Sequence, residues 1–453
     1  MNHEATGHKS RACFSEYPTP LLLEGALLPL SKVAEIHFLR RAAGCGSCHP
    51  EQPGRDLVLP FFQLAALLQV PMTRAWTING RFLSQPVTGV QRYARQIVAA
   101  LDSLAVEGHP FTRDLDLELV IPPGVEELPA LGAIHVRTAG RRGGHTWEQL
   151  ELARAVRGGL LSLCNTGPIA ARRHIVCMHD ANTRICPESY SAQFRAVYRG
   201  LMPALGRAAV SVITVSRFSA AELARWGIAR ADKIAVIPNG HEHALTWMPE
   251  RSPRTAAGGP DTVLVLGSPA PHKNIGMLAG LAPRLAAAGL RLAVAGLADG
   301  RVFQGAGQMS GVAWLGRVSD GELASLLEDC LCLAFPSFTE GFGLPPLEAM
   351  ARGCPVVASD RASLPEICGN GVLYASPDNP DAWLAAFVQL RGNAGLRVEL
   401  RERGRRQAQH FSWRASALLF LEALARADGV EFDAGGGAAE SGQSARFVTL
   451  VHM

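Results

Sequence analysis

Short apolar runs alternate with amphipathic stretches from about residue 72 to about residue 427. Short apolar runs that end at glycine, proline or polar turns are typical of strands, whereas apolar residues at helical spacing are typical of helices. In the first part of this region the pattern predicts strands at 77–83, 115–123, 134–140, 160–168, 173–180, 210–216 and 233–240. Helices are predicted within 84–104, where Val90, Tyr93, Ile97, Val98 and Leu101 share one face, and over 192–207 and 218–227. Such alternation indicates a parallel sheet with helices on both faces.

A second alternation follows a break. The segment 241–261 is polar and rich in proline and glycine, which predicts a linker. Beyond it the predicted strands are 262–268, 290–297, 312–319, 330–335, 355–360 and 371–377, and the predicted helices are 274–288 and 320–329. We therefore expect an α/β protein with two Rossmann-like domains, 72–240 and 262–410, followed by an amphipathic helix at 411–427 and a disordered tail at 428–453.

The first 71 residues do not share this pattern. They contain Cys45, Cys48 and His49 in the spacing of a c-type haem attachment site. We reject haem because no export signal is visible, and two cysteines with one histidine make an incomplete zinc set. Since Met72 directly precedes a strand-like opening, we expect residues 1–71 to be a dispensable extension or a start-site error.

Composition narrows the class of protein. The 453 residues are 48% hydrophobic and 19% charged, with a net charge of +4, which is too small to indicate nucleic-acid binding. No apolar run is long enough to cross a membrane. The ten cysteines lie mostly in apolar strands, as do Cys164, Cys177, Cys330 and Cys332. Cysteines in such positions are typical of buried, reduced thiols. We expect a cytoplasmic protein, with weak attraction to anionic lipid left open.

The stretch 335–360 carries the strongest chemical signal. A strand is followed by Glu340, by a glycine-spaced loop from Gly341 to Gly343, by a helix that begins near two prolines and contains Glu348, and by another strand. A helix N-terminus suits a phosphate, and a carboxylate accepts hydrogen bonds from a vicinal diol. The combination indicates a nucleotide-sugar site; the alternative is that both glutamates are solvated charges around an ordinary turn.

Three further segments of the sequence fall at predicted strand ends or helix starts, where ligands of parallel sheets bind. Thr88 and Gly89 begin a helix that carries Arg92 one turn in, and they predict an anion-binding loop or a plain glycine turn. His179 lies at the carboxyl end of the predicted strand 173–180 and is either a ligand contact or a satisfied histidine. Ser268 ends the predicted strand 262–268 and Lys273 follows it, where a lysine suits a diphosphate, although a lysine at a helix start is also common on surfaces.

The pair Asp114 and Asp116 has the D-x-D form of metal-dependent sugar transferases of another fold. Here it opens an alternating strand, so both aspartates would share one face. We expect that face to be solvated, without a metal.

Together these segments resemble the retaining nucleotide-sugar glycosyltransferases of the GT-B fold, group 1 or family 4. The resemblance runs from about 72 to 427 through RFLSQPVTGVQRYARQIV, HIVCMHDANTRICPE, ITVSRFSAAEL, IAVIPNG, VLGSPAPHKN, LGRVSDGELASLL, EGFGLPPLE and FSW. It implies that the two Rossmann-like domains face a cleft, the first binding the acceptor and the second the donor, and that the C-terminal helix crosses back.

The resemblance also implies roles for residues. Glu348 would bind the ribose, Glu340 would lie at the reacting centre, and His179 would contact the transferred sugar. The remaining donor contacts would be Lys273, Ser268, Gly341, Phe342, Gly343, Leu344 and Val318, and the loop that closes on phosphate or acceptor would hold Thr88, Gly89 and Arg92. Many relatives carry arginine where this chain has Ser268, which puts donor affinity and identity in doubt.

The family implies a mechanism without a cofactor or a metal. The leaving phosphate would help to deprotonate the acceptor hydroxyl on the same face, with retention of configuration. The expected partners are a nucleotide diphosphate sugar, GDP-mannose first and UDP-sugars or dTDP-rhamnose next, and a sugar or lipid-linked oligosaccharide acceptor. That acceptor would bring the protein to the inner face of a membrane. The alternatives are a nucleotide-sugar 2-epimerase, a glycogen-type synthase, or a catalytically weak partner subunit.

Overall fold

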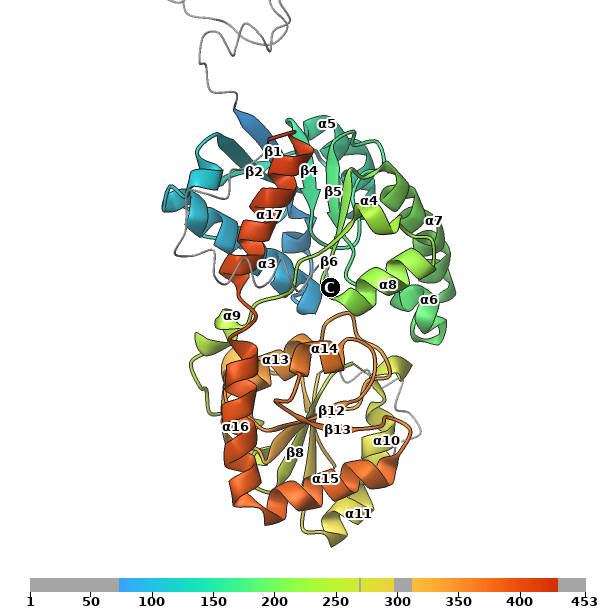
Figure 1. Cartoon of the computed structure of the whole chain (residues 1–453), viewed down its shortest axis with the longest axis vertical. Helices are drawn as coiled ribbons and strands as arrows, with labels where there is room; N and C mark the ends of the chain where they lie inside the picture. The colour runs from blue at the N-terminus through green and yellow to red at the C-terminus, as the bar shows by residue number, and fades with distance from the viewer. Residues whose placement is uncertain (1–72, 269, 297–311, 431–453) are drawn as a thin grey trace, which may run out of the picture. The chain divides into compact units, whose positions relative to one another are not determined.

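The protein is described by a computed structural model that covers residues 73–268, 270–296 and 312–430 (Figure 1). The expectations for residues 1–71, including Cys45, Cys48 and His49, lie outside the described residues, and so does the tail from residue 431.

The amino-terminal half is built on a seven-stranded sheet in the order β3-β2-β1-β4-β5-β6-β7. Every pair of neighbouring strands is parallel, as the alternation predicted. The strands are β1 Arg74–Asn79, β2 Leu115–Ile121, β3 His135–Thr138, β4 Gly159–Ser162, β5 His174–Cys177, β6 Ser211–Thr214 and β7 Ile234–Val236. The helices are α3 Gly89–Val106, α4 Gly144–Thr146, α5 Ala153–Ala155, α6 Asn182–Ile185, α7 Ala192–Ala208 and α8 Arg217–Arg225.

The carboxyl-terminal half repeats this architecture on a six-stranded parallel sheet in the order β10-β9-β8-β11-β12-β13. The strands are β8 Thr262–Leu266, β9 Arg291–Ala295, β10 Val312–Gly316, β11 Cys332–Phe335, β12 Val356–Ser359 and β13 Leu373–Ala375. The helices are α10 Ile275–Gly280, α11 Ala282–Ala287, α12 Asp320–Asp329, α13 Leu344–Ala351, α14 Leu364–Cys368, α15 Pro380–Gly392 and α16 Ala394–Ala408. The prediction of two parallel-sheet α/β halves is confirmed.

Two predicted elements differ from the structure. The strand expected at 77–83 runs from Arg74 to Asn79 and is followed by a 3₁₀ turn, Gly80–Ser84, because the Asn79 side chain accepts a hydrogen bond from the Arg81 N–H and ends the strand. The helix expected at 274–288 is two helices, α10 and α11. Pro283, the second residue of α11, has no N–H to continue the hydrogen-bond ladder of α10.

The segment 241–261, expected to be a linker, contains packed structure at its start. It forms α9, Glu242–Leu245, and buries His243 and Trp247. The Trp247 ring lies at 5.6 Å from the His243 ring in an edge-on arrangement. The first residues after the amino-terminal half therefore belong to the packed interior of the molecule.

A final helix, α17 Trp413–Ala427, follows the carboxyl-terminal half and packs against α3 of the amino-terminal half (Figure 1). Ser412 caps it by accepting a hydrogen bond from Ala415 N–H. This is the crossing helix that the family resemblance implied.

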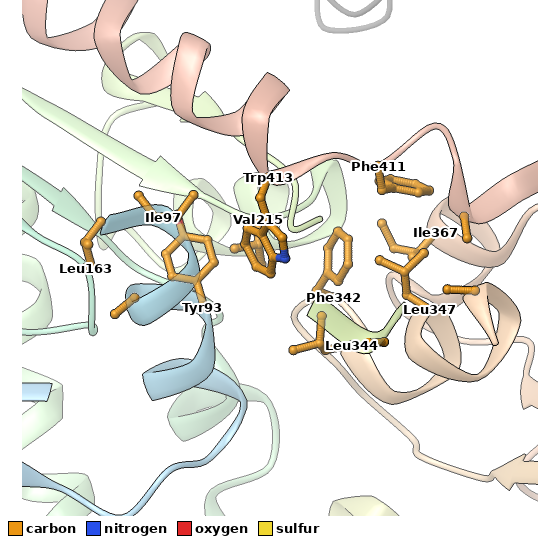
Figure 2. Close-up of a cluster of buried hydrophobic side chains, with 14 of the residues drawn as sticks. Tyr93, Ile97, Leu163, Val215, Phe342, Leu344, Leu347, Ile367, Phe411 and Trp413 are labelled. Atoms are coloured by element: carbon orange, nitrogen blue, oxygen red, sulfur yellow. The ribbon is translucent and has the colours of Figure 1, made fainter. Parts of the chain in front are cut away.

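One buried apolar cluster connects elements of both halves through this helix (Figure 2). The Trp413 ring lies 5.9 Å from the ring of Tyr93 on α3, and the Phe342 ring lies 5.7 Å from that of Phe411. Phe342 is only 4% exposed, so the glycine loop that contains it is anchored in the core by its side chain.

The cysteines of the described part of the chain are free thiols. Cys177, Cys330 and Cys332 are buried and Cys164 is half-buried, which agrees with the prediction of reduced thiols in apolar strands. Within the described ranges, no helix combines the length and the apolar character that a membrane crossing requires.

The end of α17 is held by Asp428, whose side chain is 4% exposed. Its carboxylate accepts a hydrogen bond from Trp76 Nε1 at 3.0 Å and pairs with Arg173 Nη1 at 3.0 Å and Arg74 Nη1 at 3.4 Å. The first and last described elements are therefore joined by one buried acid.

We expect Asp428→Ala to lower the free energy of unfolding by about 2 to 4 kcal/mol, because it removes the acceptor of the buried Trp76 indole N–H and the carboxylate that pairs with Arg74 and Arg173. Denaturant unfolding measures the change. Asp381→Ala, which removes a carboxylate that is 77% exposed, is the matched control and should change stability by less than about 1 kcal/mol. Equal stability of the two variants would contradict this account.

Candidate active site

The site lies at the carboxyl ends of β8 and β11, which are neighbours in the sheet. The chain leaves β8 toward β9 and β10 on one side, whereas β12 and β13 extend the sheet on the other side of β11. Ligands of open parallel sheets bind at such a switch point, because the loops there leave in opposite directions. The loop after β8 carries Ser268 and Lys273, and the loop after β11 carries Glu340 and its glycines.

Lys273 and Glu340 form the charged centre of these two loops. Lys273 Nζ lies 2.7 Å from Glu340 Oε1 and 3.0 Å from Oε2. Glu340 is 8% exposed and the Lys273 side chain 22%. The ammonium also lies 5.6 Å from the centre of the Phe335 ring at the end of β11. The predicted lysine and the first predicted glutamate are therefore brought together, with the lysine accessible from one side.

Gly341 joins this centre to the amino-terminal half by close backbone approach. A Cβ at Gly341 would lie 2.5 Å from the His179 carbonyl oxygen, so a side chain does not fit. The Gly341 carbonyl accepts hydrogen bonds from Ser216 Oγ at 2.6 Å and from Ser219 Oγ at 3.1 Å. Ser219 Oγ also lies 2.9 Å from the His179 carbonyl. The predicted histidine strand end and the predicted glycine loop are thus in direct contact.

The start of α13 presents backbone N–H groups. Gly343 precedes the helix with φ +96°, a conformation that favours glycine, and a Cβ there would lie 2.6 Å from Leu364 Cδ2. Pro345 and Pro346 supply no N–H, so the donors at this end come from the loop itself. In the described part of the chain, the N–H groups of Phe342 and Gly343 donate no hydrogen bond. These two N–H groups are therefore free to donate to an anion.

His179 is buried, and its ring is held by two neighbours. Its Nε2 lies 2.9 Å from the Leu163 carbonyl oxygen, and the Tyr93 ring packs edge-on at 4.7 Å. Because a carbonyl only accepts, Nε2 carries the proton, and in the neutral ring Nδ1 is an acceptor. Burial lowers the pKa of His179 to about 4, with the hydrogen bond to Leu163 opposing that shift. Nδ1 of His179 can therefore accept a hydrogen bond from a hydroxyl group.

Asp180 adds a second carboxyl group beside Glu340. Burial raises the pKa of Asp180, the charge of Glu340 raises it further, and Lys273 lowers it. Its Oδ1 accepts a hydrogen bond from Asn182 N at 2.8 Å. One ammonium and two carboxyl groups therefore share the region where the two halves meet.

The second glutamate of the motif, Glu348, is buried and hydrogen-bonded. His243 Nε2 lies 2.9 Å from Glu348 Oε1, and Trp413 Nε1 donates to His243 Nδ1 at 2.9 Å. The indole N–H fixes the histidine tautomer with its proton on Nε2, so His243 donates to the glutamate. No described residue donates a hydrogen bond to the other oxygen, Oε2. The described side-chain contacts of Glu348 therefore all go to Oε1.

The guanidinium of Arg92 pairs with carboxylates of the carboxyl-terminal half. Its Nη1 and Nη2 lie 2.9 and 2.5 Å from the two oxygens of Asp320, and its Nε lies 3.8 Å from Glu348 Oε1. The guanidinium also stacks over Trp247 at 5.2 Å. Burial lowers the pKa of Arg92, but the hydrogen bond to Asp320 and the charge of Glu348 outweigh burial and raise it overall.

The remaining predicted site residues are exposed or half-buried. Thr88 and Gly89 are exposed at the start of α3, where Gln91 Oε1 accepts a hydrogen bond from Thr88 N at 3.2 Å. Ser268 is half-buried after β8. Val318 is half-buried between β10 and α12 and packs against the core.

Sequence reasoning missed three residues that complete the site: His243, Asp320 and Ser216. His243 was hidden in a segment of linker-like composition, although Trp247 four residues later was an available sign of packing. Ser216 and Asp320 look like ordinary residues at the starts of helices, and only the tertiary contacts with Gly341 and Arg92 distinguish them.

The described ranges contain no group of three or more histidine, cysteine, aspartate or glutamate side chains placed to hold a metal ion. Asp114 and Asp116 are both exposed at the start of β2, which confirms the expectation of a solvated face.

Comparison with known proteins identifies the family. The model described as glycosyltransferase family 4 matches residues 87–245, and the model described as glycosyl transferases group 1 matches residues 249–407. The O-antigen chain mannosyltransferase B of Escherichia coli is 31% identical over 273 residues, which cover 54% of this chain and 68% of the relative. The chain belongs to the group 1 glycosyltransferases.

Solved structures match the GT-B fold of this glycosyltransferase. A sucrose-phosphate synthase from Thermosynechococcus elongatus superposes with a TM-score of 0.57 at 18% identity, covering 78% of this chain and 98% of the other. Anabaena HepE in complex with UDP and glucose superposes with a TM-score of 0.55 at 17% identity, covering 78% of this chain and 100% of the other.

The buried His179 makes the stability of the glycosyltransferase depend on pH. Its pKa is about 4 in the folded chain and about 6.5 when exposed, so between these values the unfolded chain binds more protons. This contribution to stability is present above about pH 6.5 and is lost as the pH falls. Between pH 7 and pH 5 the free energy of unfolding of wild type should fall by about 2 kcal/mol because of His179. We expect this part of the fall to be missing in His179→Gln.

Unfolding in denaturant at both pH values measures this difference. His410→Gln, which replaces an exposed histidine, is the control and should keep the wild-type dependence on pH. If His179→Gln and wild type lose the same stability, then His179 is not held neutral by its surroundings.

Proposed function

We propose that this glycosyltransferase moves a hexose from a nucleotide diphosphate sugar to a hydroxyl of a sugar or lipid-linked acceptor, in the synthesis of a polysaccharide or glycolipid. The observation that carries the proposal is the pairing of Lys273 with Glu340 beside the Phe342 and Gly343 N–H groups at the β8–β11 switch point. An ammonium next to unpaired N–H groups suits a diphosphate, and carboxylates suit sugar hydroxyls.

The donor is proposed to be GDP-mannose. Support comes from the E. coli relative, whose name is O-antigen chain mannosyltransferase B. UDP-sugars and dTDP-rhamnose are the next candidates. The protein is proposed to act in the cytoplasm, where a lipid-linked acceptor would hold it at the inner face of the membrane.

Each group of the site has a proposed task. Glu348, oriented by His243, would bind the ribose with its second oxygen. Lys273 and the two N–H groups would stabilise negative charge that develops on the leaving phosphate. Glu340 would hold the sugar hydroxyls while its charge is balanced by Lys273, and His179 would accept a hydrogen bond from the sugar. Arg92 would exchange Asp320 for a phosphate when the donor binds.

Transfer is proposed to proceed with retention of configuration. The bond from the anomeric carbon to the phosphate oxygen breaks, and the acceptor oxygen attaches on the same face. The leaving phosphate takes the acceptor proton, so that no carboxylate nucleophile is required. The protein contributes positioning and electrostatic stabilisation.

A catalytically weak partner subunit is the second candidate, and Ser268 is the observation that favours it. In the place where many relatives carry arginine, this half-buried hydroxyl supplies no charge to a diphosphate. Lys273 would then be the main cation for the phosphates. Incubation with labelled nucleotide sugars separates the candidates: a partner subunit binds no donor, and an epimerase converts the donor without an acceptor.

We expect Glu340→Gln to lower the rate of sugar transfer by about a hundredfold with the fold intact, because it removes the charge that Lys273 balances and that faces the reacting sugar. Transfer from radiolabelled GDP-mannose, read at saturating donor, measures the loss. Glu402→Gln, at a carboxylate that is 61% exposed on α16, is the matched control and should transfer at the wild-type rate. An unchanged rate in Glu340→Gln would remove Glu340 from the reacting centre.

We expect transfer to be independent of a divalent cation, since Lys273 and the loop N–H groups would supply the positive field. Assays with excess chelator and with added Mg²⁺ or Mn²⁺ should give rates within about twofold of each other. A loss of activity on chelation that is restored by one of these ions would refute this part of the mechanism.

A further inference from the structure

The peptide groups of the glycine loop are held by their carbonyl oxygens. Ser216 Oγ donates a hydrogen bond to the Gly341 carbonyl at 2.6 Å. Ser363 Oγ lies 3.0 Å from the Phe342 carbonyl oxygen and 3.0 Å from the Glu340 carbonyl oxygen. Both serines are fully buried. Three successive carbonyl oxygens of the loop therefore face serine hydroxyls.

These hydrogen bonds also decide where the N–H groups of the loop point. The peptide bonds of the described residues are trans, and in a trans peptide group the C=O of one residue and the N–H of the next point in opposite directions. The Gly341 carbonyl shares its peptide group with the Phe342 N–H, and the Phe342 carbonyl shares its peptide group with the Gly343 N–H. Because both carbonyls are bound to serines, the two free N–H groups point to the opposite side of the loop.

The two serines come from different halves of the molecule. Ser363 lies directly before α14, in the same half as the loop. Ser216 is the N-cap of α8 in the amino-terminal half, and its Oγ also accepts a hydrogen bond from Ser219 N at 3.0 Å. Ser219 Oγ is a second and longer donor to the Gly341 carbonyl, at 3.1 Å. The direction of the Phe342 N–H therefore depends on a contact between the two halves.

Glu366 on α14 fixes the start of α8 beside the loop. Its Oε1 accepts a hydrogen bond from Arg217 N at 2.9 Å, and its Oε2 accepts one from Phe218 N at 3.2 Å. These are the first two N–H groups of α8, at the positive end of the helix dipole, where a carboxylate is favourable. The same turn of chain therefore holds the Phe342 carbonyl through Ser363 and the start of α8 through Glu366.

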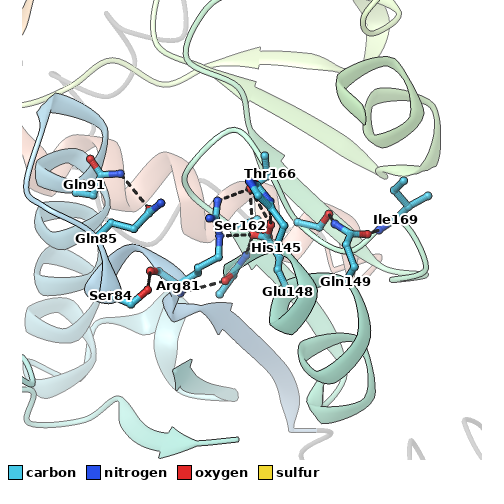
Figure 3. A network of polar contacts seen from close by, with 12 residues as sticks. Arg81, Ser84, Gln85, Gln91, His145, Glu148, Gln149, Ser162, Thr166 and Ile169 are labelled. Atoms are coloured by element: carbon cyan, nitrogen blue, oxygen red, sulfur yellow. Dashed lines mark hydrogen bonds and ion pairs between the residues drawn. The ribbon is translucent and has the colours of Figure 1, made fainter. Parts of the chain in front are cut away.

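A second buried polar network stays within the amino-terminal half (Figure 3). Glu148, 1% exposed, accepts hydrogen bonds from Asn79 Nδ2 at 2.7 Å and from Thr166 Oγ1 at 2.9 Å. Its Oε1 also lies 3.1 Å from Arg81 Nε. None of the described hydrogen bonds of Glu148 reaches the glycine loop. This network stabilises one half alone and is the reference for a purely structural role.

We propose that Ser216 and Glu366 are positioning residues for the donor diphosphate. Ser216 directs the Phe342 N–H at a phosphate oxygen, and Glu366 keeps α8, and with it Ser216, on the loop. A donor group that is already oriented binds charge without a further cost of ordering. The inference rests on the proposed function, since it assumes a diphosphate at Phe342 and Gly343. The phosphate site of the carboxyl-terminal half is then complete only while the amino-terminal half is in contact with it.

The test uses the full chain as wild type, Ser216→Ala, Ser216→Thr, Glu366→Gln and the double variant Ser216→Ala with Glu366→Gln. The matched controls are Thr166→Val, which removes a fully buried hydroxyl of the Glu148 network, and Glu402→Gln, which changes a carboxylate that is 61% exposed. Calorimetry measures the Kd of GDP, UDP and dTDP. For the diphosphate that binds wild type, ligand-detected NMR measures the Kd of the matching nucleoside, which has no phosphate.

We expect Ser216→Ala to raise the Kd of the diphosphate about tenfold, the effect of misdirecting one hydrogen bond to a charged group, and to leave the Kd of the nucleoside within about twofold. Glu366→Gln should raise the diphosphate Kd by about threefold, because its amide oxygen still accepts one N–H. Ser216→Thr should recover most of the loss because it keeps the hydroxyl. The double variant should lose less than the product of the single losses, since both changes release the same loop. Thr166→Val should lower the free energy of unfolding, and both controls should keep the wild-type Kd values.

The two proposals fail in different ways. If wild type binds none of the three diphosphates, the proposed function is overturned and this inference with it. If wild type binds one of them but Ser216→Ala and Thr166→Val have equal Kd values for it, the positioning role is overturned and the donor site stands. An equal rise in the Kd of the diphosphate and of the nucleoside in Ser216→Ala would also overturn the role, because Ser216 would then act on the fold. If Ser216→Ala does not fold, Glu366→Gln decides, and a diphosphate Kd equal to that of Glu402→Gln would overturn the inference.

Discussion

The contact between Gly341 and the end of β5 is the constraint on which the rest of the site depends. The loop after β11 reaches the His179 carbonyl only because residue 341 has no side chain, and two serines of the amino-terminal half, Ser216 and Ser219, bind the Gly341 carbonyl. This contact brings Glu340, and Lys273 with it, next to Asp180 and His179. The charged groups of the site come from both halves, and neither half contains the set alone.

Helix α17 and Arg92 also connect the amino-terminal half to the carboxyl-terminal half. Helix α17 begins at Trp413, which fixes the tautomer of His243 and through it the orientation of Glu348. Asp428, directly after the helix, accepts a hydrogen bond from Trp76 in the first described strand. Arg92 reaches from α3 to Asp320 on α12. The residue that would bind the ribose is thus supported by elements from four parts of the chain. This explains why the family pattern extends over most of the sequence and is not confined to one motif.

Sequence patterns predicted the architecture well, because alternation of apolar runs and amphipathic stretches directly reflects parallel strands and covering helices. They failed locally where one residue decides an outcome, as at Asn79, which ends β1, and at Pro283, which divides the expected helix. Spacing also predicted Glu340, Lys273, Gly341 and His179, which the structure places together. It could not reveal that Arg92 pairs with Asp320 or that His243 binds Glu348, since both contacts join residues more than 100 positions apart. The network around Glu148 was also missed, because Arg81 and Thr166 reach Glu148 only in the folded sheet.

The central claim is that the nucleotide sugar binds at the β8–β11 switch point, with its phosphates on the N–H groups of Phe342 and Gly343. Amide hydrogen exchange in the absence and presence of saturating GDP-mannose tests it most directly, because these N–H groups donate to no described residue and their exchange reports a new acceptor. The account predicts slower exchange of residues 341–344 on donor binding, with exchange in β2 and β3 unchanged. Donor binding that leaves the exchange of residues 341–344 unchanged would contradict it.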